Sequence, residues 1–177
     1  MSIAKVYKNV YLIGGKLIDK NDTNAYLIYN EKEDYYTLID TTTGSNIEYI
    51  IETLLEIMKG EKKLKFIILT SCKKENAGGL NTLYNLFYPI TIAHFPDSLM
   101  IRQGECEREK IVSSPISLEI KERYFELNDI RIFLTRTLTK GSIIVLYQNI
   151  LFTGSNTRLS TYDPNIKYIC DINECRK

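Results

Sequence analysis

The hydrophobic pattern changes its period between residues 35 and 94, and this change restricts the possible folds more than any other feature of the chain. Residues 35–41, YYTLIDT, read as a strand, whereas apolar residues at three- and four-residue steps over 45–59 predict an amphipathic helix that ends at Gly60. The series continues with a buried strand at 64–70, a second helix at 77–87 and a short strand at 90–94. Such a β-α-β-α-β series predicts parallel pairing of its strands.

Further strands are predicted on both sides of this series. They lie at 9–16 and 24–30 before it and, after it, in hairpins over 117–137 and 142–155 and in a last strand at 166–172. Between the two groups, residues 96–102 predict a short helix and residues 104–110, GECEREK, a charged loop. Because the sequence contains no linker and no internal repeat, we expect one domain over residues 1–177.

The composition excludes several classes of function. The 177 residues carry a formal net charge of +1, which argues against a strongly basic nucleic-acid-binding protein. No apolar run approaches the ~18 residues of a membrane-spanning helix, and the N-terminus lacks the pattern of a secretory signal peptide. We therefore expect a cytoplasmic protein that does not contact a membrane.

The cysteines do not follow the spacing of a zinc site. They are Cys72, Cys106, Cys170 and Cys175. Reduced thiols are the expectation for a cytoplasmic protein, and a local disulfide between Cys170 and Cys175 is the alternative.

Four short segments occur in an order that is typical of one known family. TNAYLI (23–28) precedes TLIDTTTG (37–44), and FIILTSCKKENAGGL (66–80) follows. TRTLTKGSIIVL (135–146) and NILFTGS (149–155) lie in the second half. Together they resemble the metallo-β-lactamase family, with its N-x-Y-L-I and Asp-x-Gly strands, its T-H-x-H-x-D-H-x-G-G metal motif, and its T-P-G-H-T-P-G-S and L-F-x-G-D segments. The resemblance implies an α/β fold of four layers, the αββα sandwich.

The residues that bind metal in that family are replaced in this sequence. The resemblance assigns six ligand positions, which hold Ser71, Lys73, Glu75, Asn76, Leu138 and Ser155. Only Glu75 offers an anionic ligand, although Asn76 and Ser155 offer neutral oxygens. Zinc and iron prefer imidazole, thiolate and carboxylate ligands, and a lysine ammonium repels a nearby dication. We therefore expect no metal and no other cofactor.

Basic residues surround the expected position of the lost metal site. Those predicted to converge on one edge of the cleft are Lys73, Lys74, Arg136, Lys140 and Arg158. Such a group favours an anion, for example a phosphate, a carboxylate or a nucleic-acid backbone. The alternative is that Lys73 pairs with Glu75 or points to solvent, and that these loops are simply polar.

Cys72 and His94 are the remaining candidates for chemistry. Cys72 lies beside two lysines near the start of a helix, a setting that activates thiols, and His94 ends the neighbouring strand, where it could act as a base. The alternatives are a buried structural cysteine and a locally hydrogen-bonded histidine. The residues interpreted as structural are Asp40, Gly78, Gly79, Gly141 and Gly154.

Three functions follow from these patterns. The preferred one is a non-catalytic metallo-β-lactamase-fold protein that acts as a binding or scaffold subunit, through a protein partner or as a homodimer. The second is a nucleic-acid or nucleotide-binding module that uses the basic cleft. The third is a hydrolase with a rebuilt site, either on Cys72 or on one metal held by Glu75 and His94.

Overall fold

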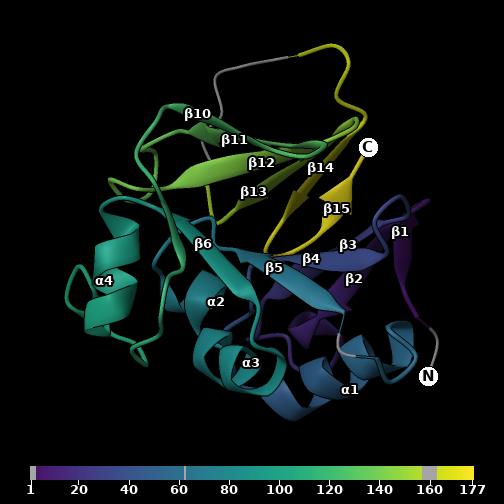
Figure 1. The fold of residues 1–177 in the computed structure, drawn as a ribbon, viewed down its shortest axis with the longest axis horizontal. Coiled ribbons are helices and arrows are strands. Elements are labelled where there is room, and N and C mark those ends of the chain that lie inside the picture. The colour runs from purple at the N-terminus through teal and green to yellow at the C-terminus, as the bar shows by residue number, and fades with distance from the viewer. Residues whose placement is uncertain (1–2, 62, 157–162) are drawn as a thin grey trace.

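The structure is a computed structural model that describes residues 3–61, 63–156 and 163–177, and its framework is a pair of β-sheets (Figure 1). The first sheet contains β1 (Lys5–Tyr7), β2 (Val10–Gly14), β3 (Asn24–Asn30), β4 (Tyr35–Ile39), β5 (Leu64–Ile68), β6 (Ile90–His94) and β9 (Leu118–Ile120), in the order β1-β2-β3-β4-β5-β6-β9. Strands β1 to β4 pair antiparallel, and β4, β5, β6 and β9 pair parallel. The predicted parallel β-α-β-α-β series is confirmed.

The helices lie against the first sheet. They are α1 (Ile47–Ile57), α2 (Lys74–Ala77), α3 (Leu80–Phe87) and α4 (Asp97–Gln103), and a 3-10 turn, η1 (Gly15–Leu17), follows β2. The predicted helix at 77–87 is divided: Ala77 ends α2, Gly78 and Gly79 form a turn, and α3 contains the remaining residues. The predicted short helix after Pro96 is present as α4.

The second sheet is formed by the C-terminal part of the chain. It contains β10 (Tyr124–Leu127), β11 (Ile130–Leu134), β12 (Ile143–Tyr147), β13 (Ile150–Gly154), β14 (Tyr168–Asp171) and β15 (Cys175–Arg176), in sequence order. The segment 117–137, predicted as one hairpin, is instead divided between the sheets: β9 pairs with β6, and β10 pairs with β11. The segment 104–110, predicted as a loop, contains a small hairpin of β7 (Glu105–Cys106) and β8 (Glu109–Lys110).

Two hydrophobic cores fill the spaces between the layers. One lies between the helices and the first sheet and includes Leu27, Leu54 and Leu83. The other lies between the two sheets and includes Tyr26 and Phe152, whose ring centroids are 5.3 Å apart. In the part of the chain that the structure describes, no helix covers the outer face of the second sheet, where Ile144, Leu146 and Leu151 pack with Phe133 and Ile166 (Figure 1).

Within the described residues, no helix is both long enough and apolar enough to span a bilayer.

The core between the sheets makes a direct prediction about stability. Phe152 is almost fully buried there, so Phe152→Ala removes a large apolar group and leaves a cavity. We expect a loss of about 3–5 kcal/mol in the free energy of unfolding, measured by urea denaturation. The matched control is Tyr124→Ala at the edge of the same sheet, where the side chain is 45% exposed. Equal losses in the two variants would contradict the assigned core.

Candidate functional site

The strands β4, β5 and β6 end at the same edge of the first sheet, and the candidate site is built from the residues that follow them. Asp40 follows β4, and residues 70–76, here called the motif loop, follow β5. Asp40 is buried and has a left-handed backbone, with φ 62°. Its carboxylate accepts hydrogen bonds from the backbone N–H and the hydroxyl of Thr70 and from the amide of Asn76, at 2.7–2.9 Å. Burial raises the pKa of Asp40 to about 7, although these hydrogen bonds act in the opposite direction.

Three of the six ligand positions lie in one hydrogen-bonded cluster. The side-chain oxygen of Asn76 accepts hydrogen bonds from the hydroxyls of Ser71, at 2.6 Å, and Ser155, at 3.0 Å. The amide nitrogen of Asn76 donates to Asp40, so both ends of this side chain are used. Asn76 and Ser155, which are 79 positions apart in the sequence, are thus brought into direct contact. We call Asp40, Thr70, Ser71, Asn76 and Ser155 the polar cluster.

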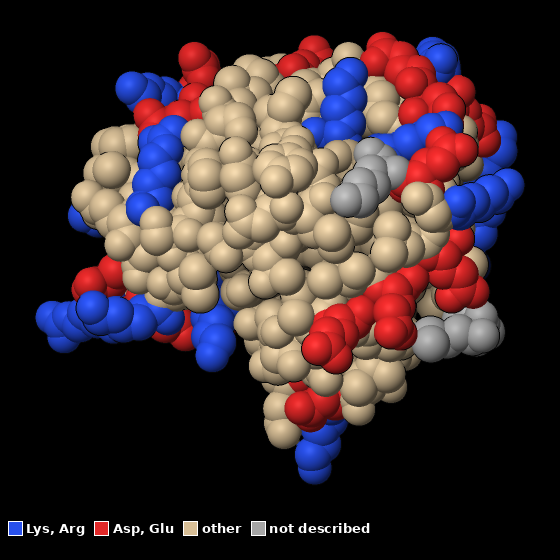
Figure 2. All heavy atoms as spheres, turned by 60° about the horizontal axis from the view of Figure 1, so that its bottom comes forward, with Lys and Arg blue, Asp and Glu red and all other residues tan. Residues whose placement is uncertain are grey.

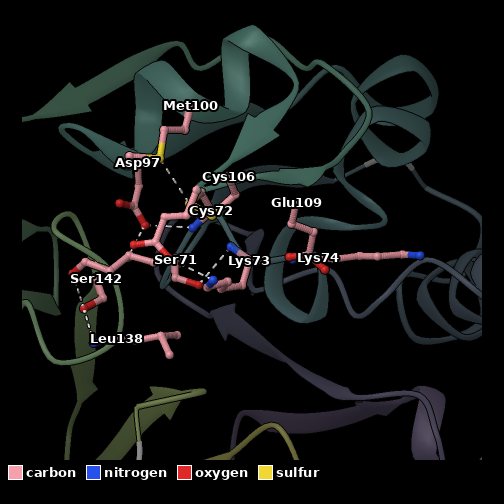
Figure 3. A network of polar contacts seen from close by, with 12 residues as sticks. Ser71, Cys72, Lys73, Lys74, Asp97, Met100, Cys106, Glu109, Leu138 and Ser142 are labelled. Atoms are coloured by element: carbon pink, nitrogen blue, oxygen red, sulfur yellow. Dashed lines mark hydrogen bonds and ion pairs between the residues drawn. A yellow bond between two sulfur atoms is a disulfide. The ribbon is translucent and has the colours of Figure 1, made fainter.

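The other three ligand positions do not join the polar cluster. The ammonium group of Lys73 forms an ion pair with Glu107, at 2.9 Å, rather than with Glu75. Glu75 is partly exposed, and its backbone carbonyl accepts a hydrogen bond from Thr23. Leu138 is partly buried in the loop between β11 and β12, residues 135–142, here called the facing loop, and its N–H donates to Ser142 (Figure 3).

Asp97, which the sequence analysis did not single out, joins the motif loop to the facing loop (Figure 3). Its carboxylate accepts hydrogen bonds from Cys72 N–H at 2.8 Å, from the Thr139 hydroxyl at 2.5 Å and from Gly141 N–H at 2.9 Å. Burial raises the pKa of Asp97, and the three hydrogen bonds oppose that effect. An Asp that directly follows a Pro at the start of a helix is typical of the first helical turn. The sequence therefore does not indicate that Asp97 connects two loops.

Asp22 is another buried carboxylate that the sequence patterns do not identify. It accepts hydrogen bonds from Thr43 N–H and from the side chains of Thr43 and Asn46, and so ties the segment before β3 to the start of α1. Burial alone would raise the pKa of Asp22, but the hydrogen bonds outweigh it and the pKa is lowered. Asp22 supports the backbone next to the candidate site.

All four cysteines form disulfides, which corrects the expectation of reduced thiols. Cys72 is bonded to Cys106, and Cys170 to Cys175 as the alternative proposed. Cys72 therefore has no thiol that could act as a nucleophile. The pairing with Cys106 could not be read from the sequence, because 34 positions separate the two residues. Disulfides persist mainly in oxidising compartments or in proteins of hyperthermophiles. The two disulfides therefore weigh against the predicted cytoplasmic location, and that location stays a prediction.

His94 is held by local hydrogen bonds, as one of the two alternatives stated. It is buried, with Nδ1 at 2.6 Å from the Phe95 carbonyl oxygen and Nε2 at 2.8 Å from the Glu122 carbonyl oxygen. Both ring nitrogens are therefore occupied by backbone groups. This geometry does not support His94 as a metal ligand or a general base.

The basic residues of the predicted anion site are only partly placed. Lys74, Arg136 and Lys140 are exposed, and Arg158 lies outside the described residues. The N–H of Lys74 donates to the carboxylate of Glu109, at 3.2 Å. The acidic partners of Lys73 and Lys74 come from the β7–β8 hairpin, which the sequence analysis interpreted as a solvated loop.

Glycines allow the loops of the site to approach closely. A Cβ atom on Gly78 would lie 2.0 Å from the Thr43 carbonyl oxygen, and one on Gly154 would lie 2.0 Å from the Thr70 hydroxyl. Gly154 also has φ +57°. The corresponding distances are 2.4 Å at Gly79, to the Thr41 carbonyl, and 2.7 Å at Gly141, to the Asp97 carboxylate. A side chain at these positions would force the loops apart.

The residues at the ligand positions do not fit a catalytic metal. In residues 3–61, 63–156 and 163–177, no three His, Cys, Asp or Glu side chains lie close enough together to hold an ion. The polar cluster presents hydroxyls and one amide that already bind one another, and Leu138 offers no donor atom. Zinc sites need three or four imidazole, thiolate or carboxylate ligands at ~2.0–2.3 Å.

Comparison with known proteins identifies the fold. A metallo-β-lactamase from Cronobacter sakazakii, a mutant in its HARLDQ motif, matches with a TM-score of 0.76 and 11% identity over 97% of this chain and 80% of that chain. The metallo-β-lactamase MIM-1 from Novosphingobium pentaromativorans matches with a TM-score of 0.71 and 14% identity over 90% and 63% of the two chains. SMB-1, in a complex with mercaptoacetic acid, matches with a TM-score of 0.71 and 16% identity over 92% and 68%.

The chain therefore has the metallo-β-lactamase fold, as the sequence resemblance predicted. No protein-family model matches it, and no curated protein has a significantly similar sequence. At these low identities the likeness establishes the fold and not the activity.

The polar cluster predicts that the direction of the hydrogen bond between Asp40 and Asn76 matters. In Asp40→Asn two amide nitrogens face each other, so a buried donor is left unpaired and we expect a loss of about 1–3 kcal/mol in the free energy of unfolding. The exchange variant Asp40→Asn/Asn76→Asp reverses the bond, while the carboxylate introduced at position 76 still accepts from both serines, and should recover most of the loss. Urea denaturation of the three proteins measures this. A double variant no more stable than Asp40→Asn would contradict the assignment.

Asp40 also predicts a dependence of stability on pH. Its pKa is about 7 in the folded protein against an ordinary value of 3.8, so the folded state holds the extra proton between these values. The stabilisation from Asp40 is then fully present below pH 3.8 and is lost as the pH rises through about 7. The free energy of unfolding of the wild type, minus that of Asp40→Asn, should fall over this range. A difference independent of pH would show that Asp40 keeps its ordinary pKa.

Proposed function

We propose that this chain is a non-catalytic protein with the metallo-β-lactamase fold, and that it acts by binding or supporting another protein. The observation that carries the proposal is the polar cluster. Ser71, Asn76 and Ser155, three of the six ligand positions, bind one another instead of leaving ligand atoms directed at a common point. A site whose polar groups are mutually satisfied has little to gain from a metal ion.

Electrostatics at the other ligand positions supports the same proposal. Lys73 stands at a position that the resemblance assigns to a metal ligand, and its ammonium group, which has no lone pair to donate to a metal, is paired with the carboxylate of Glu107. Leu138 places an apolar side chain, which has no donor atom, at another of these positions.

The motif of the Cronobacter protein allows a limited comparison. Written in the same order, HARLDQ has a cation at its third position and an amide at its sixth, as has Ser71–Asn76, which reads SCKKEN. It keeps His at the first position and Asp at the fifth, where this chain has Ser71 and Glu75. This chain therefore departs further from the family pattern than that protein does.

The surface over α3 supports binding to a protein. Residues 76–96 contain no Asp, Glu, Lys or Arg, and Tyr88 and Ile90 are 76% and 40% exposed. Figure 2 shows a broad uncharged area on the side of the molecule that carries the helices, bordered by both acidic and basic residues. An aromatic side chain on an uncharged surface is typical of protein interfaces. Both a different protein and a second copy of this chain are predicted as partners for this surface.

The two other functions have less support. For nucleic-acid or nucleotide binding, the charge of Lys73 is already paired with Glu107. For a rebuilt hydrolase, Cys72 lies in a disulfide and both ring nitrogens of His94 face backbone carbonyls. We therefore prefer the binding or scaffold role.

The metal content of the purified protein tests this proposal. Without a metal-affinity tag, we expect less than about 0.1 equivalent of zinc, iron and manganese per chain by elemental analysis, because the ligand positions offer no adequate donor set. The variant Ser71→His/Lys73→His/Asn76→His should bind about one equivalent of zinc if the backbone geometry of the fold is retained.

The matched control places three histidines on separate exposed elements, in Lys32→His/Lys110→His/Lys167→His. This control should bind no stoichiometric zinc. About one equivalent of metal in the wild type, lost in Glu75→Ala or His94→Ala, would overturn the proposal and favour a hydrolase.

A further inference from the structure

The β7–β8 hairpin is fastened onto the motif loop by three different interactions. The disulfide joins Cys106 to Cys72, the carboxylate of Glu107 pairs with the ammonium of Lys73, and the carboxylate of Glu109 accepts the N–H of Lys74. Three consecutive residues of the motif loop are thus bound to one short hairpin. Figure 3 shows Cys106 and Glu109 on the same side of this loop.

The hairpin has little stability of its own. Each strand has two residues, and the turn between them consists of Glu107, with φ 54°, and Arg108, with φ 112°. A turn with two positive φ angles favours Asn and Gly, and other residues adopt it at a cost. Since even long isolated hairpins are marginally stable in water, the disulfide is the strongest single constraint on the position of this hairpin.

The hairpin brings negative charge to the basic part of the motif loop. The hydrogen bond to Glu107 raises the pKa of Lys73, with a smaller contribution from the charge of Glu109. The carboxylates of Glu107 and Glu109 therefore occupy the position that an external anion would take beside Lys73 and the N–H of Lys74. This contact is the intramolecular equivalent of a bound ligand.

We propose that the β7–β8 hairpin is a redox-released cover over a binding site for a small oxyanion, such as a phosphate group, at Lys73. When the Cys72–Cys106 bond is broken, the hairpin opens, Glu107 and Glu109 leave, and an oxyanion binds the ammonium of Lys73 and the N–H of Lys74. The inference goes beyond the proposed binding or scaffold role and does not rest on it.

The release is a two-electron reduction by a dithiol. One thiolate of the reductant attacks a sulfur of the Cys72–Cys106 bond and releases the other cysteine as a thiolate. The second thiolate of the reductant then attacks the mixed disulfide, which releases the remaining cysteine thiolate and leaves the reductant as a disulfide. Cys72 and Cys106 each gain one electron and one proton. Both cysteines are fully buried, so their reduction is slow and follows that of Cys170–Cys175, whose second cysteine is partly exposed.

The test compares two variants that each lack one disulfide. Cys72→Ala/Cys106→Ala removes the proposed latch, and Cys170→Ala/Cys175→Ala is the matched control. Hydrogen exchange of residues 105–110 reports opening of the hairpin, and calorimetric titration with inorganic phosphate reports the anion site. We expect faster exchange and at least about fivefold tighter phosphate binding in the first variant, and wild-type behaviour in the control.

Further variants keep the test decisive if the first one does not fold. Glu107→Gln/Glu109→Gln retains both disulfides and should also bind phosphate more tightly, and adding Lys73→Ala to it should return the affinity to the wild-type value. Phosphate affinity equal in the wild type and Glu107→Gln/Glu109→Gln would overturn the anion site. Exchange of residues 105–110 that is the same in the wild type with and without a dithiol, once mass spectrometry shows Cys72 and Cys106 reduced, would overturn the release.

Discussion

The buried carboxylate of Asp40 is the interaction on which the candidate site depends. Asp40 lies at the end of β4, and its two oxygens receive three hydrogen bonds from Thr70 and Asn76 of the motif loop. Asn76 in turn is bonded to Ser71 and to Ser155 after β13. One buried carboxyl group thereby sets the positions of segments from both sheets. Its burial raises its pKa, although the hydrogen bonds that order the loops act in the opposite direction.

Close contact between the loops makes this arrangement possible. The loop after β4 lies against the break between α2 and α3, where a Cβ on Gly78 would collide with the Thr43 carbonyl oxygen. On the other side, Asp97 binds Cys72 and Gly141 and so connects the motif loop to the facing loop. Hydrogen bonds and a disulfide therefore hold together the segments that, by the resemblance, a metal ion would join. The fold can keep the geometry of its loops while the donor atoms of a metal site are absent.

The sequence predicted those parts of the structure that depend on local patterns. The change from the strand pattern of residues 35–41 to the helical pattern of residues 45–59 predicted α1, and the apolar runs around it predicted the parallel strands β4, β5 and β6. Burial of one helix face and of whole strands leaves a strong apolar signal. The sequence did not predict that β9 pairs in the first sheet. Strand β9 has three residues, too few to show a periodicity, and β10 begins only three residues after it. The start of the predicted helix at 77–87 was also misjudged, because a separate helical turn, α2, precedes Gly78 and Gly79, and α3 begins at Leu80.

The contacts of the candidate site were harder to predict from the sequence than the fold, because they join residues that are far apart along the chain. The resemblance gave the six ligand positions, but the pairing of Lys73 with Glu107 depends on where a hairpin 34 residues away is attached. Glu75, the nearest acidic residue in the sequence, has its own backbone bonded to Thr23 and does not take that role. The cation that opposes a metal at this site is thus balanced by an acid from outside the motif. The charge of Lys73 is neutralised by the β7–β8 hairpin, whose position depends on the Cys72–Cys106 disulfide. For this reason the properties of the motif loop cannot be inferred from the motif alone.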